Sequence, residues 1–118
     1  MVIIRFPNGN EWFRANWIFR QLAEDVVEMF PDDDELKYSM VESAALGALF
    51  LDGMEQSVAS RIVRAIRTVA ERTIEGSIQG WNRTRPMDKE GQRMYMEGMS
   101  ELLDILSRTD DEDSVSRP

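Results

Sequence analysis

The chain of 118 residues has the length of one domain, and its hydrophobic content of 42% with a mean hydropathy of -0.40 is ordinary for a globular protein. It contains no histidine and no cysteine, which excludes imidazole bases, thiolate nucleophiles, disulfide bonds and the usual soft metal ligands. The net charge of -8 opposes binding to nucleic acid or anionic lipid over most of the surface.

The charge is distributed unevenly along the chain. Residues 32–56 carry a net charge of -6, residues 57–93 carry +4, and residues 94–118 carry -5. Two interpretations are open for the basic middle segment: it packs against the acidic segments of the same chain, or it binds an external anion. We favour the first, because it requires no partner.

The first 15 residues predict a β-hairpin. Apolar residues alternate over residues 2–6, and Asn8-Gly9 is typical of a two-residue type I′ turn. Such a turn would pair Arg5 with Trp12 in a cation–π contact and would place Phe13 on the apolar face. We expect the outer edges of this hairpin to be free to pair with another chain.

Residues 17–30 predict a first helix, because apolar side chains recur at helical spacing and Pro31 ends the pattern. Asn16 is the expected N-cap. The same spacing predicts an outer face with three carboxylates: Glu24, Asp25 and Glu28.

Three further helices follow from the same periodicity, over residues 33–51, 54–79 and 88–107. Asp32 or Asp33 caps the first of these, Gly53 ends it, and Val41 belongs to its inner face. Asp88 caps the last.

The fold class is therefore mainly α (α+β), with an N-terminal β-hairpin packed on a compact bundle of about four helices. Residues 1–108 are expected to form a single globular domain, and the acidic residues 109–118 a disordered tail.

Two acidic groups are the candidate partner-binding residues. A calcium loop beginning at Asp32 is excluded, because its sixth and twelfth positions are Lys37 and Ser43. The alternative is that both groups are solvated helix faces. The candidates are Asp32, Asp33, Asp34, Glu35, Glu97, Glu101 and Asp104.

A basic group in the middle segment is the candidate anion-binding site. Arginine forks suit phosphate and carboxylate, and a tryptophan in the loop can stack on a base. Glu71 and Glu75 on the same helix, together with the net charge, favour a solvated or internally paired face instead. The candidates are Arg61, Arg64, Arg67, Trp81, Arg83 and Arg85.

The last helix combines glycines with methionines, among them Gly98, Met94 and Met99. Two interpretations are open: core filling within the monomer, or a surface where another helix approaches closely.

No P-loop, dinucleotide fingerprint or nucleophile elbow is present, so we expect no enzyme activity, no cofactor and no metal. The hypothesis is a small acidic protein-binding module. In size and charge it resembles bacterial immunity proteins, antitoxins and phage-encoded inhibitors, without a shared motif, which implies a basic protein partner.

Two alternatives remain open: a homodimeric scaffold or accessory subunit joined through the fourth helix or the hairpin edge, and a nucleic-acid-binding regulator using residues 61–85. Residues 1–7 have no signal-peptide pattern, and the longest apolar run, residues 44–51, is too short to cross a bilayer. We therefore expect a cytoplasmic location.

Overall fold

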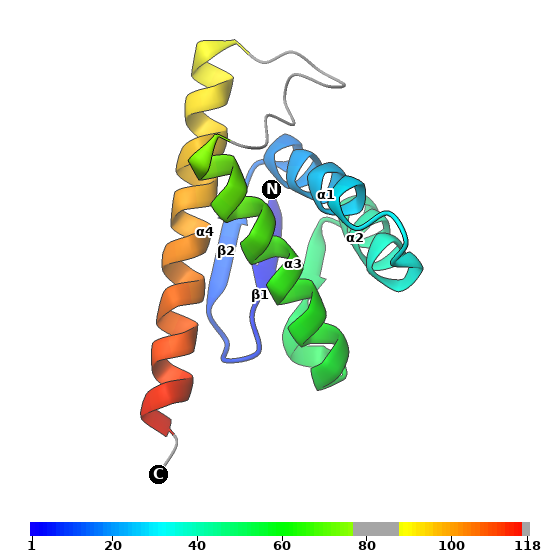
Figure 1. The fold of residues 1–118 in the computed structure, drawn as a ribbon, viewed down its shortest axis with the longest axis vertical. Coiled ribbons are helices and arrows are strands. Elements are labelled where there is room, and N and C mark those ends of the chain that lie inside the picture. The colour runs from blue at the N-terminus through cyan, green and yellow to red at the C-terminus, as the bar shows by residue number, and fades with distance from the viewer. Residues whose placement is uncertain (77–87, 117–118) are drawn as a thin grey trace.

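The computed structural model describes residues 1–76 and 88–116, and of residues 109–116 only the backbone. Within these residues, three strands form one small sheet, and α3 crosses one face of it while α4 lies along β2 (Figure 1). The mainly α (α+β) prediction, with an N-terminal hairpin and four helices, is confirmed. The elements are β1 (Val2–Arg5), β2 (Glu11–Arg14), α1 (Asn16–Met29), α2 (Asp34–Leu46), β3 (Ala48–Phe50), the short 3-10 helix η1 (Leu51–Gly53), α3 (Gln56–Glu75) and α4 (Lys89–Ser116).

The hairpin closes through a three-residue loop instead of the predicted two-residue turn. The N–H of Gly9 donates to the carbonyl of Phe6 over 2.9 Å, and the N–H of Phe6 donates to the carbonyl of Asn10 over 2.8 Å. Pro7 takes the second position of the turn, which its fixed φ favours, and Gly9 adopts a φ of 92°. The loop is therefore one residue longer than expected.

This extra residue shifts the strand register and exchanges the two faces of β2. Arg5 lies opposite Glu11, so the predicted pairing of Arg5 with Trp12 is wrong. Trp12 is completely buried, whereas Phe13 is 50% exposed. The cation–π partner of Arg5 is instead Phe50, whose ring centre lies 4.9 Å from the guanidinium carbon.

The predicted helix over residues 33–51 ends early and is followed by a strand. Gly47 adopts a left-handed φ of 78° and donates its N–H to the carbonyl of Ser43 over 2.8 Å, so Gly47 and not Gly53 ends α2. The next three residues form β3, which pairs in parallel with β1 and places Leu49 beside Ile4 in the core. One edge of the hairpin is thus occupied by the same chain, and the sheet order is β2-β1-β3.

The helix caps follow the sequence in two cases and depart from it in one. The side chain of Asp33 accepts from the N–H of Leu36 over 3.1 Å, and that of Asp88 accepts from the N–H of Gly91 over 2.7 Å. Both caps were predicted. The prediction of Asn16 as a cap is wrong, because it is already the first residue of α1.

The last helix is longer than the periodicity predicts. The backbone of α4 continues to Ser116, within the segment whose composition predicts disorder. Acidic residues near a helix C-terminus oppose the macrodipole, which is why the sequence does not predict this extension. The division into a domain and a tail stays a prediction. Among the described residues, no helix combines the length and hydropathy that crossing a bilayer requires.

The core is centred on Trp12, whose indole N–H donates to the carbonyl oxygen of Gly98 on α4 over 3.1 Å. The helix surface at Gly98 therefore packs against β2 of its own chain. Met99 is completely buried, which supports core filling at that position, whereas Met94 is 37% exposed.

We predict that Gly98→Ala raises the free energy of unfolding by about 0.5–1 kcal/mol, since alanine is the better helix former. A Cβ at this position would meet Ile18 Cγ2 at 3.4 Å and Trp12 Cζ2 at 3.7 Å, which are ordinary contacts. Gly98→Leu should destabilise the fold, because a larger side chain has no room beside Trp12. Urea denaturation of both variants is the measurement, and a destabilised Gly98→Ala would contradict the prediction.

Candidate binding surfaces

The acidic run at the start of α2 is paired within the chain. Arg61 on α3 places Nη2 2.5 Å from Asp33 Oδ2 and Nη1 2.9 Å from Glu35 Oε1. The hydrogen bond from Arg61, supported by the N–H of Leu36, holds the pKa of Asp33 below its ordinary value of 3.8. The basic segment and the first acidic segment therefore meet here, as the intramolecular interpretation predicts.

The acidic side chains of α4 are also paired. Glu101 accepts from Arg14 of β2 over 2.5 Å, and Glu97 accepts from Arg93 over 2.5 Å. Asp104 accepts from Arg108 one turn further along the helix. Among the described residues, only two candidate partner-binding acids make no ion pair: Asp32 and Asp34.

The candidate anion-binding arginines are divided between two places. Arg61 neutralises the start of α2, whereas Arg64 and Arg67 line a cavity between α3 and the hairpin turn. The loop candidates Trp81, Arg83 and Arg85 lie outside the described residues. Arg61 also borders a hollow, but that hollow is lined by Asp32, Asp33 and Asp34, which oppose an anion. Arg64 and Arg67 are therefore the two described candidates beside a cavity without such an acidic cluster.

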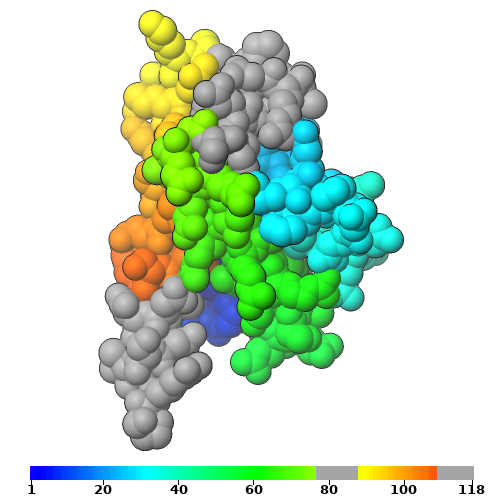
Figure 2. All heavy atoms as spheres, in the orientation of Figure 1, coloured from blue at the N-terminus to red at the C-terminus, as the bar shows by residue number. Residues whose placement is uncertain are grey.

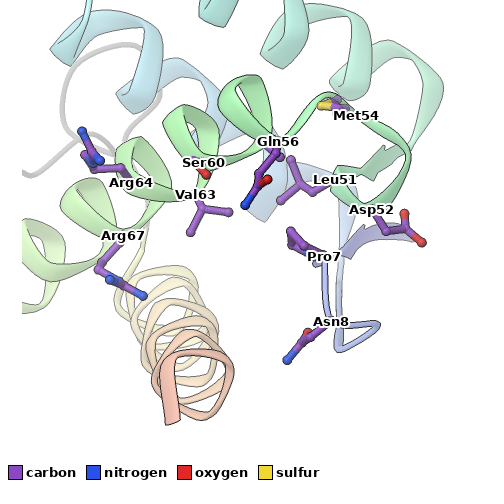
Figure 3. Close-up of a pocket in the computed structure, with 11 residues that line it drawn as sticks. Pro7, Asn8, Leu51, Asp52, Met54, Gln56, Ser60, Val63, Arg64 and Arg67 are labelled. Carbon is purple, nitrogen blue, oxygen red and sulfur yellow. The ribbon is translucent and has the colours of Figure 1, made fainter. Parts of the chain in front are cut away.

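That cavity, which we call the hairpin–α3 pocket, has a volume of about 450 Å³ (Figure 3). Three segments enclose it: the hairpin turn, η1 and the first three turns of α3. Apolar residues form much of its wall, and polar groups from α3 and the turn reach its opening. The lining residues are Pro7, Asn8, Leu51, Asp52, Met54, Gln56, Ala59, Ser60, Val63, Arg64 and Arg67.

The segment from α2 to β3 exposes large apolar side chains, one of which the periodicity assigned to the interior. Val41 is 58% exposed, so its prediction as an inner-face residue is wrong. The inner face of α2 is formed by Leu36, Met40 and Ser43 instead. The four most exposed large apolar residues of this segment are Tyr38 (69%), Val41, Leu46 (72%) and Phe50 (46%).

The two faces of the sheet differ in how they are covered. Seen from the α3 side, the helices hide the sheet except for a small area of the hairpin (Figure 2). On the opposite face, Phe13 and Phe50 remain about half exposed, and Ile3 is partly buried between their strands. This face and the outer side of α2 are the apolar surfaces that the described helices leave open.

A buried polar cluster joins α1 to α4, and the sequence did not predict it. Asp25 is 2% exposed, so its assignment to an outer carboxylate face is wrong. It accepts from the hydroxyl of Tyr95 over 3.1 Å and from Nε2 of Gln21 over 3.2 Å. Burial, together with the charge of Asp25, raises the pKa of Tyr95 well above its ordinary value of 10.0. In the sequence, the one indication of its burial was that Asp25 lies next to the apolar stripe of α1.

Comparison with protein-family models, curated proteins and solved structures gives no match for this chain. Within residues 1–76 and 88–108, no three aspartate or glutamate side chains gather in a group that could hold a metal ion. The candidate surfaces are therefore interpreted from their own chemistry.

We predict that Arg61→Gln raises the pKa of Asp33, because its strongest stabilising hydrogen bond is lost. A carboxylate whose pKa is lowered by folding stabilises the fold above the unfolded pKa, and this contribution disappears as the pH falls through the folded pKa. Arg61→Gln should therefore be less stable than wild type at pH 7, and this difference should be smaller at pH 3. Carboxyl NMR titration measures the shift, with Arg64→Gln as the matched control. An unchanged pKa of Asp33 in Arg61→Gln would refute the assignment.

We predict that Tyr95→Phe lowers the free energy of unfolding at pH 7 by about 1–2 kcal/mol, because Asp25 loses a buried donor. The raised pKa of Tyr95 also makes wild-type stability fall as the pH rises above about 10, since the unfolded chain then releases a proton that the folded chain keeps. This alkaline fall should be smaller in Tyr95→Phe. Denaturation at pH 7 and pH 11 tests both effects, and Tyr38→Phe, at a tyrosine that is 69% exposed, is the control for the loss at pH 7. If stability depended equally on pH in wild type and in Tyr95→Phe, the raised pKa of Tyr95 would be contradicted.

Proposed function

We propose that the protein is a non-catalytic protein-binding module that docks on a basic partner through the segment from α2 to β3. The observation that carries this proposal is a coincidence of charge and exposure. Residues 32–56 have a net charge of -6, and they also carry four strongly exposed large apolar side chains: Tyr38, Val41, Leu46 and Phe50.

The two properties have complementary roles in recognition. Exposed apolar side chains supply contact area that is gained only when a partner covers them. Carboxylates around them steer a basic partner and repel nucleic acid and acidic proteins. Asp34 makes no ion pair among the described residues. It precedes Val41 by seven residues and Tyr38 precedes Val41 by three, so all three lie on the same side of α2. The surface thus combines an apolar stripe with unneutralised negative charge.

This proposal moves the partner-binding site away from most of the acids that the sequence suggested. Asp33 and Glu35 are neutralised by Arg61, and the acids of α4 have arginine partners of their own. Exposed ion pairs of this kind are weak, so they do not prevent binding, but they reduce the charge that a partner meets.

The charge also argues against self-association through this surface. Two copies would bring together two surfaces whose acids are only partly neutralised by Arg61 and Arg5, and like charges across an interface are unfavourable. The homodimeric scaffold is therefore the second proposal. Light scattering over a range of concentrations tests it, because a protein that stays monomeric at every concentration would exclude a homodimer.

The main test is capture of partners from lysates of the source cells with three immobilised proteins. We expect wild type to retain a basic protein and the triple variant Tyr38→Ser/Val41→Ser/Leu46→Ser to retain at least tenfold less, because the apolar contacts are gone. Ile74→Ser, at a residue of α3 that is 38% exposed, is the matched control and should behave as wild type.

Retention should also fall as the salt concentration rises, because steering charges are screened. Circular dichroism verifies that each variant is folded, which is expected because exposed substitutions change stability by only about 0.5 kcal/mol. Equal retention by the triple variant, or an acidic retained protein, would refute the proposal.

A further inference from the structure

We propose that the hairpin–α3 pocket binds a small amphipathic anion, namely an apolar body that carries one carboxylate or phosphate group. The pocket begins at η1, directly after β3, and none of the four exposed apolar side chains proposed for protein binding lines it. The proposal therefore does not depend on that function. Its volume of about 450 Å³ lies within the range of about 300–1,000 Å³ that is typical of small-molecule sites.

The inner wall of the pocket is apolar. Leu51 and Ala59 are buried, and Met54 and Val63 are partly buried, and all four line the pocket from η1 to α3. Pro7 closes the side toward the hairpin turn. A ring or a short alkyl chain seated here would remove apolar area from water on both partners.

The polar groups of the pocket come mainly from one face of α3. Gln56, Ser60, Arg64 and Arg67 follow each other at spacings of three and four residues, so they line the same side of the helix. In Figure 3, the side chains of Gln56 and Arg67 point into the space that Asn8 borders from the opposite side. An amide, a hydroxyl and the guanidinium of Arg67 are donors from which a carboxylate or a phosphate accepts.

The one acidic residue in the lining does not oppose an anion directly. The carboxylate of Asp52 points away from the pocket in Figure 3, and its Oδ2 lies 3.9 Å from Nη1 of Arg5. Arg67 already interacts within the chain, but a guanidinium has five N–H donors and can hold a second acceptor. Arg64 points away from the space in Figure 3, so Arg67 supplies the local positive charge, in a chain whose total is -8.

The overall negative charge determines which anions fit. A highly charged inorganic ion gains only the arginine contacts and is repelled by the rest of the protein. An anion with an apolar body gains the inner wall as well. The pocket therefore favours amphipathic anions over inorganic phosphate.

The test is NMR titration of the ¹⁵N-labelled full chain with four probes: benzoate, phenyl phosphate, benzamide and inorganic phosphate. Benzamide has the shape of benzoate without its charge. We expect saturable amide shifts at Asn8, Gln56 and Ser60 with benzoate or phenyl phosphate, with a Kd below about 1 mM. The stronger of these two probes identifies the anionic group. Benzamide and inorganic phosphate should bind at least tenfold more weakly.

Two variants and one control make the result specific to this pocket. Arg67→Gln should weaken binding of the stronger probe at least tenfold, and Ser60→Trp should abolish it by filling the space. Arg20→Gln, at an exposed arginine of α1 outside the pocket, should bind as wild type does. The proposal is overturned if no anionic probe gives saturable shifts, if benzamide binds as well as benzoate, or if both pocket variants retain full affinity.

Discussion

The attachment of α4 to the first 25 residues holds the molecule together. The indole N–H of Trp12 donates to the carbonyl of Gly98, and two residues further along β2 Arg14 pairs with Glu101. On the same buried face of α4, three residues before Gly98, Tyr95 donates to the buried carboxylate of Asp25 in α1. A buried polar group without its partner costs about 1–3 kcal/mol, so these contacts specify one position of α4 along the sheet.

The sequence predicts those parts of the fold that depend on local physics. The four helices and the hairpin were expected, as were the caps at Asp33 and Asp88, because each rests on side chains within a few residues of one another. Features that depend on contacts between distant residues could not be predicted in this way. An Asn-Gly turn and a Pro-Asn-Gly turn compete in the same five residues, and a difference of one residue exchanges the two faces of β2. Likewise, residues 48–50 are apolar and fit the end of the predicted helix equally well. Only their pairing with β1 makes them a strand.

The candidate sites show the same difference between local features, which the sequence predicts, and long-range features, which it does not. Pairing between the basic and acidic segments follows from the charge distribution, and Arg61 with Asp33 confirms it. Which apolar residues remain exposed does not follow from composition, because α2 is apolar on more than one side and periodicity cannot choose between them. Asp25 was misplaced for a related reason. A carboxylate is normally solvated, and one of the donors that make its burial favourable is the hydroxyl of Tyr95, 70 residues away in the sequence.

The contacts of α4 have a consequence for the order in which the chain is made. Synthesis proceeds from the N-terminus, so Trp12 and Asp25 emerge long before Gly98 and Tyr95 exist. Until then the hairpin exposes an indole, and α1 carries a carboxylate on the side that must become interior. The N-terminal part therefore completes its packing only after α4 has been synthesised.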